Sequence, residues 1–106
     1  MNMTKKVKQL LKKHINTVKN MYPELYIDVD MVGEDILVAI DSLDISNEER
    51  YKKLMSDFIK EYFSKGYFDI YWGVDSNLTC DNVSLLEDID KIPSKENFNE
   101  KSVVNF

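Results

Sequence analysis

Four aspartates that recur in strand-like segments are the residues of this sequence whose type and spacing best suit chemistry at a surface. Apolar and polar side chains alternate over residues 25–31, 36–41 and 67–75, which is the period-two pattern of a half-buried strand. Because successive side chains of a strand point to opposite faces, one face of the predicted sheet carries all four aspartates. That face contains Tyr26, Asp28, Asp30, Asp41, Asp69 and Tyr71. Aspartate is depleted in strands, so this concentration needs a reason.

The acidic face has three interpretations that the sequence leaves open. As a docking surface it would bind a basic protein partner, with the carboxylates steering association and Tyr26 and Tyr71 acting as anchors. As a solvated face it would use charge for solubility and against edge-to-edge aggregation. As a pocket it would hold a small ligand or substrate between the two tyrosines and two of the aspartates.

The other reactive side chains form no recognisable catalytic or metal-binding motif. His14 is the only histidine and Cys80 the only cysteine, which excludes an intramolecular disulfide and a cysteine or histidine metal cluster. We expect His14 to be partly buried and hydrogen-bonded to a neighbour, and Cys80 to be a small core or edge residue. The segment that begins at Asp28 resembles a calcium loop, but Ala39 stands where the acid of the twelfth position is required. We therefore predict no metal and no cofactor.

The distribution of charge separates the start of the chain from the rest. Residues 1–23 contain six lysines and no acid, whereas residues 24–106 hold all 19 acids and eight of the 14 bases, a net charge of −11. The lysine-rich segment could face nucleic acid or an anionic membrane. However, the acidic remainder argues against direct nucleic-acid binding, and the apolar side of the segment lacks the Trp and Phe that favour a membrane surface.

The expected location is the cytoplasm. No apolar run approaches the roughly 18 residues that a membrane span needs. The basic start of the chain is not followed by the continuous apolar region of a secretory leader.

Two helices are predicted beside the strands. The apolar arc of residues 4–22 at helical spacing predicts a first helix, which Pro23 ends. A capping box from Ser46 to Glu49 predicts the start of a second helix, and Gly66 is expected just beyond its end. Gly33 predicts a tight turn between the first two strands.

The order α-β-β-α-β-(β) predicts an α+β fold of two layers, with a small, largely antiparallel sheet and both helices packed on one of its faces. The bracketed fourth strand is expected over residues 78–80, followed by a brief helix around 83–89. The side chains expected beneath the helices are Leu25, Ile27, Val29, Ile36, Val38, Ile40, Phe68, Ile70 and Trp72. We assign residues 1–93 to a single domain and residues 94–106 to a polar C-terminal tail.

The leading functional hypothesis is a small, acidic, non-enzymatic protein that acts by occupying the surface of a partner protein, as inhibitors, immunity proteins and anti-defence proteins do. One alternative is a ligand-binding protein or enzyme with a Tyr/Asp pocket on the sheet. Another is a subunit that self-assembles through aromatic side chains of the second helix, namely Tyr51, Tyr62 and Phe63, unless these pack on the first helix or the tail.

Overall fold

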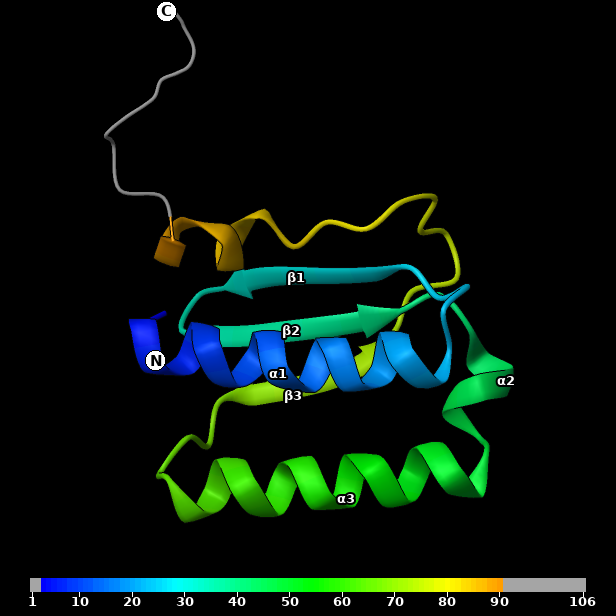
Figure 1. Ribbon diagram of the computed structural model, residues 1–106, viewed down its shortest axis with the longest axis horizontal. Helices are drawn as coiled ribbons and strands as arrows, with labels where there is room; N and C mark the ends of the chain where they lie inside the picture. The colour runs from blue at the N-terminus through cyan, green and yellow to red at the C-terminus, as the bar shows by residue number, and fades with distance from the viewer. Residues whose placement is uncertain (1–2, 91–106) are drawn as a thin grey trace, which may run out of the picture.

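The computed structural model describes residues 3–90, which form an α+β fold with a three-stranded mixed sheet (Figure 1). The elements in chain order are α1 (Lys5–Met21), β1 (Ile27–Val32), β2 (Asp35–Ile40), α2 (Leu43–Ser46), α3 (Glu49–Ser64), β3 (Ile70–Val74) and the 3₁₀ helix η1 (Ser84–Asp90). The predicted tail over residues 94–106 lies outside the described residues.

The sheet has the strand order β1-β2-β3. β1 and β2 are antiparallel, with Ile27 opposite Ile40, and β2 and β3 are parallel, with Ile36 opposite Ile70. The prediction of a largely antiparallel sheet was therefore wrong for one of the two strand pairs. The physical reason is the long connection through α2 and α3, which returns the chain to the starting end of β2 before β3 begins.

Local signals explain most of the element boundaries. The Thr4 side chain accepts a hydrogen bond from the Val7 amide and begins α1, and α1 ends at Met21, two residues before the proline that cannot continue it. The turn between β1 and β2 places Gly33 at φ +63°, and Gly66 takes φ +79° after α3, a region that favours glycine.

The predicted capping box is wrong. Ser42 caps the short helix α2 by accepting from the Ile45 amide, whereas Ser46 ends α2 and its hydroxyl donates to the Leu43 carbonyl. The longer helix α3 then begins at Glu49 without a side-chain cap. Ser46 therefore belongs to the helix that Ser42 begins, and the N-cap position of α3 is Glu48.

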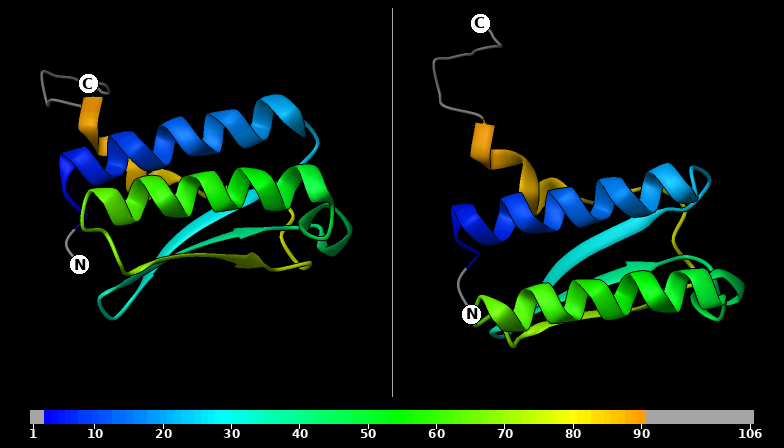
Figure 2. Two further views of the ribbon diagram at one scale, coloured as in Figure 1. Left: turned by 90° about the horizontal axis from the view of Figure 1, so that it is seen from below. Right: turned by 60° about the horizontal axis from the view of Figure 1, so that its bottom comes forward.

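The core lies between the sheet and the two long helices. Figure 2 shows α1 and α3 side by side on one side of the sheet. The buried side chains of the sheet are Ile27, Val29, Ile36, Val38, Ile40 and Ile70, and those of α1 include Leu11, Ile15 and Val18. Phe68 was expected among them but is exposed, because β3 begins only at Ile70 and Phe68 belongs to the preceding loop.

Residues 75–83 lead from the end of β3 to the outer side of β1 without forming the expected fourth strand (Figure 1). A single parallel bridge joins Asp28 and Asn82, in which the Asn82 amide donates to the Ile27 carbonyl at 2.9 Å and the Val29 amide to the Asn82 carbonyl at 2.8 Å. Asp81 adds a hydrogen bond from the Ile27 amide. The predicted brief helix is η1, which packs against α1.

Candidate functional site

The sheet face that points away from the helices contains three of the six predicted site residues close together. The strand register aligns Asp30, Leu37 and Tyr71 in one row across the three strands, and Asp28, Ala39 and Gly73 in the next. These six residues and Asp75 line a surface groove of about 410 Å³. We call this surface the outer sheet face; it comprises Asp28, Asp30, Leu37, Ala39, Tyr71, Gly73 and Asp75.

The outer sheet face combines exposed apolar side chains with acidic ones. Leu37, which is 38% exposed, lies on the central strand β2, and Tyr71, which is 50% exposed, lies beside it on the edge strand β3. Asp28 and Asp30 lie on the opposite edge strand, β1. Neither α1 nor α3 covers this side of the sheet (Figure 2). Exposed apolar and aromatic side chains bordered by charged ones are typical of a protein-binding surface.

The remaining predicted residues lie at the two ends of the sheet. The Tyr26 amide donates to the Asp41 carboxylate at 3.0 Å where β1 begins and β2 ends. Asp69 lies at the opposite end, where its carbonyl accepts from the Ile36 amide. Six strand residues separate the two ends, a distance of roughly 20 Å. The aspartates therefore border the sheet face rather than form one cluster, and Tyr26 does not line the groove that contains Tyr71.

Each carboxylate on β1 uses one oxygen in a local hydrogen bond. Asp28 accepts from the Asn82 side-chain amide at 2.8 Å, which ties the segment after β3 to the outer edge of β1. Asp30 accepts from the Met31 amide at 2.8 Å and remains exposed. Asp75 belongs to the same face, and the alternation over residues 67–75 could have added it to the predicted site.

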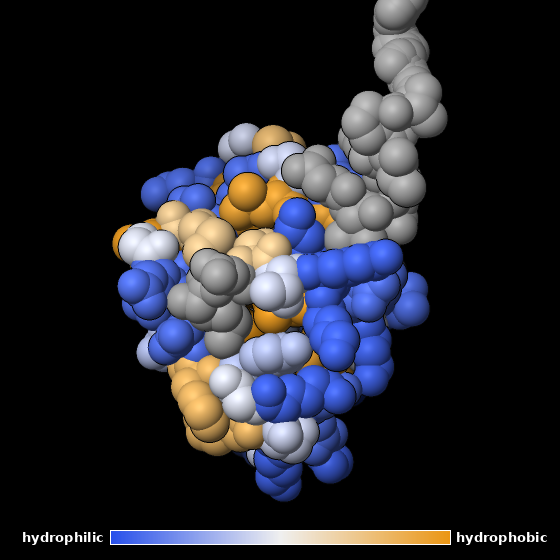
Figure 3. Space-filling model, turned by 90° about the vertical axis from the view of Figure 1, so that its left-hand side faces the viewer, coloured by the Kyte–Doolittle hydropathy of each residue, from blue (hydrophilic) through white to orange (hydrophobic). Residues whose placement is uncertain are grey.

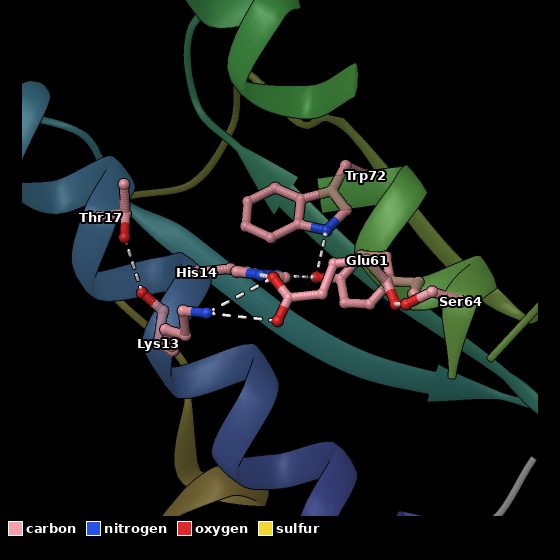
Figure 4. Close-up of polar contacts among 7 residues, drawn as sticks. Lys13, His14, Thr17, Glu61, Ser64 and Trp72 are labelled. Atoms are coloured by element: carbon pink, nitrogen blue, oxygen red, sulfur yellow. Dashed lines mark hydrogen bonds and ion pairs between the residues drawn. The ribbon is translucent and has the colours of Figure 1, made fainter. Parts of the chain in front are cut away.

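The structure contains a second cluster of polar and aromatic side chains, which the sequence pattern did not predict. His14 of α1 lies between Glu61 and Tyr62 of α3: its Nε2 is 2.9 Å from Glu61 Oε1, and its Nδ1 is 2.8 Å from the Tyr62 hydroxyl (Figure 4). The Tyr62 hydroxyl also accepts from Trp72 Nε1 at 3.1 Å, and Lys13 Nζ lies 3.2 Å from Glu61 Oε2. We call Glu61, His14, Tyr62 and Trp72 the histidine network.

The histidine network has the order carboxylate, imidazole, hydroxyl that activates nucleophiles in hydrolases, but its hydroxyl is closed to substrates. Tyr62 and His14 are each 1% exposed, and burial raises the pKa of the Tyr62 hydroxyl above its usual range. A hydroxyl that no substrate can reach and that holds its proton does not serve as a nucleophile. The network instead joins α1, α3 and β3, and it confirms the expectation that His14 is buried and hydrogen-bonded.

One arrangement of protons gives every donor of the network an acceptor, including the Tyr62 hydroxyl. Trp72 donates to the Tyr62 oxygen, the Tyr62 hydroxyl donates to Nδ1 of His14, and Nε2–H of His14 donates to Glu61. This arrangement requires a neutral imidazole. Burial lowers the pKa of His14, and the hydrogen bond and charge of Glu61, which act in the opposite direction, do not compensate. The neutral form is therefore the one that the fold selects.

The aromatic residues proposed for self-assembly do not share one surface. Tyr51 and Tyr62 are buried, so only Phe63 of the three is exposed. Phe63 packs edge-to-face on the exposed Phe68, with ring centroids 5.2 Å apart. Figure 3 views the end of the molecule that carries the α3–β3 loop, where apolar patches interrupt a largely hydrophilic surface. Burial of the two tyrosines overturns their assignment as interface residues.

A more apolar groove lies on the other side of β3, between that strand and α3. It has a volume of about 530 Å³, and its lining residues include Lys52, Met55, Ile59, Lys60, Trp72 and Val74. We call it the edge groove. The sequence pattern missed it because its residues come from both α3 and β3, and only the packing of the two elements brings them together.

The described residues contain no metal site and no membrane-crossing helix. Within residues 3–90 no three His, Cys, Asp or Glu side chains converge in a way that could hold a metal ion. None of the helices in that range has the length and apolar character to cross a membrane. Cys80 is a free, exposed cysteine.

Comparisons with known proteins add no family assignment. The sequence matches no protein-family model, and comparison with curated proteins and with solved structures finds no significant similarity. Functional inference therefore depends on the geometry of the surfaces themselves.

Proposed function

We propose that this chain is a non-enzymatic binding protein whose outer sheet face occupies a basic surface of a partner protein, in the manner of an inhibitor, immunity or anti-defence protein. The observation that carries the proposal is the uncovered sheet face, on which Leu37 and Tyr71 are exposed beside aspartates of β1 and Asp75. The proposal includes a cytoplasmic location for both proteins.

The asymmetry of charge supports this orientation of binding. The lysines of residues 1–23 belong to α1 or its start, and α1 lies on the opposite side of the sheet from the outer sheet face (Figure 2). Asp28 and Asp30 lie on β1, Asp41 directly after β2, and Asp69 and Asp75 at the two ends of β3. A basic partner would be attracted to that side and repelled from α1, which favours one docking orientation.

Chemical complementarity further narrows the type of partner. Tyr71 offers a half-exposed aromatic ring, a side chain that is enriched at the energetic centres of interfaces. Asp28 and Asp30 would form ion pairs with Arg or Lys at the rim, where such pairs contribute more to association rate than to affinity. The partner is thus expected to present an apolar patch bordered by basic residues.

The test is affinity capture from a lysate of the native host, followed by binding measurements with the purified partner. The variant Asp30→Lys/Tyr71→Ala changes the outer sheet face at two exposed positions, and Glu49→Lys on α3 is the matched charge-reversal control. We expect the wild type and the control to retain a basic protein that the double variant binds at least about tenfold more weakly. Association should slow as salt is raised.

A captured partner that binds the double variant as tightly as the wild type would refute the use of this face. Recovery of no specific protein at low salt, with folded bait confirmed by circular dichroism, would count against a protein-binding function altogether. If retention of the partner did not depend on salt concentration, the acidic residues would have no role in its binding.

A further inference from the structure

The free edge of β3 and the edge groove beside it form a site into which another strand would fit. β3 is the last strand in the order β1-β2-β3, and no other segment of residues 3–90 pairs with its outer edge. α3 overhangs this edge and contributes Met55 and Ile59 to the groove, while Trp72 and Val74 contribute from β3. Ile59 and Val74 are exposed apolar side chains.

The hydrogen-bond pattern shows which backbone groups of β3 face the groove side. The Ile36 amide donates to the Asp69 carbonyl, and the Asp75 amide donates to the Ile40 carbonyl. Alternate residues of a strand point their backbone groups to the same side. The backbone of residues 69, 71, 73 and 75 therefore faces β2, and that of Ile70, Trp72 and Val74 faces the uncovered edge. Such an edge is a template for strand addition.

The charges on the rim of the groove specify the occupant. Lys52 and Lys60 both line it, and Lys60 follows Lys52 by eight positions on the helix, a rise of about 12 Å. In an extended chain, side chains four residues apart lie on one face about 13 Å apart. Two acidic residues at that spacing, with an apolar residue midway between them, would match the two lysines and the apolar side chains of Met55 and Ile59 on α3.

We propose that the edge groove binds an extended segment of a partner protein with the pattern acid-x-apolar-x-acid, which adds to β3 as a fourth strand beneath α3. A second copy of this chain fits less well. Pairing two β3 edges would bring two lysine-lined grooves together, and each copy carries a net charge of −5. This inference does not depend on the outer sheet face and stands or falls separately from it.

The test titrates the capped peptide Thr-Glu-Thr-Ile-Thr-Glu-Thr into the isotopically labelled full chain and follows backbone amide signals by NMR. We expect saturable shifts at Trp72, Val74 and Ile59, with a dissociation constant on the order of 0.1–1 mM, since one short strand buries little area. The amide of Asp30, on the far edge strand, should not move.

A charge swap tests recognition of the lysines. Lys52→Glu/Lys60→Glu should weaken binding of the acidic peptide about tenfold, and the same variant should bind a peptide in which lysine replaces both glutamates. Lys53→Glu is the control, because Lys53 is 81% exposed on α3 and does not line the groove. Equal affinity of the wild type and the double variant for the acidic peptide would overturn the assignment of the occupant.

Backbone methylation tests strand addition itself. In an extended peptide the Glu and Ile amides point to one edge and the Thr amides to the other. Methylating one of these sets should abolish binding and methylating the other should not, and the sensitive set reports whether the added strand is parallel or antiparallel. If both sets or neither abolish binding, strand addition is wrong. Concentration-dependent shifts of β3 amides without peptide would instead identify a second copy as the occupant.

Discussion

Replacing Tyr62 with Phe tests whether the histidine network holds the layers of the fold together. The substitution removes one oxygen and leaves the ring in place. That oxygen accepts from Trp72 Nε1 at 3.1 Å and is 2.8 Å from His14 Nδ1, so two polar groups lose a partner at once. His14 is 1% exposed, whereas Trp72 is only partly buried.

The magnitude follows from the number and burial of the groups left without a partner. An unsatisfied buried polar group costs about 1–3 kcal/mol; His14 belongs in the upper part of that range and Trp72 at its lower end. We expect Tyr62→Phe to lower the free energy of unfolding by about 2–4 kcal/mol, a large share of the roughly 5–15 kcal/mol typical of a domain. The melting temperature should fall by about 10–25 °C.

The assay is urea unfolding followed by circular dichroism and by the fluorescence of Trp72, the only tryptophan. Tyr51→Phe is the matched control: Tyr51 is 4% exposed, and its hydroxyl makes no hydrogen bond with another described residue. Removing that hydroxyl should be neutral or stabilising. Equal unfolding free energies for Tyr62→Phe and Tyr51→Phe would refute the role we give to the network.

Two further predictions concern proton uptake and backbone strain. Burial lowers the pKa of His14 in the folded state; Glu61 acts in the opposite direction and Lys13 in the same direction. The unfolded chain therefore binds the proton first as pH falls below about 6.5. Stability measured by urea unfolding should therefore decline from about pH 7.5 to 5.5, and the slope should be smaller in His14→Gln; an unchanged slope would assign it to other groups. Gly66→Ala should destabilise the protein by about 1–2 kcal/mol in thermal melts, because φ at Gly66 is +79°. Gly73→Ala is the control and should be neutral or stabilising, because nothing lies within 4 Å of the added carbon. A similar loss for both glycines would contradict the assignment of strain to Gly66.

The sequence predicted the elements that depend on near neighbours. The arc of apolar side chains identified α1 within one residue of its bounds, and alternation identified the inward side of β1 and β2 because a strand with one buried face must alternate. Gly33 and Gly66 were placed at turns that require positive φ. Each of these inferences uses contacts within a few residues.

The features that depend on distant parts of the chain were not predicted. No local pattern shows where β3 joins the sheet or that it runs parallel to β2. His14 and Tyr62 are 48 residues apart, and their contact exists only because α1 and α3 pack side by side. The burial of Tyr51 and Tyr62 follows from the same packing. Alternation placed Asp28, Asp30 and Tyr71 on one face of the sheet, but it did not show that Tyr26, Asp41 and Asp69 lie beyond the ends of the strands.

The two proposals share one physical basis, which is a three-stranded sheet covered by helices on one side and left open on its other face and at β3. An exposed apolar centre and an uncovered edge promote aggregation unless charge prevents it. The aspartates around Leu37 and Tyr71 could therefore act only as protection, the alternative that the sequence leaves open. Neutralising the two carboxylates of β1 with Asp28→Asn/Asp30→Asn distinguishes the two roles. If the aspartates steer binding, the rate of association with a basic partner should fall. If they merely protect the sheet, only solubility should fall.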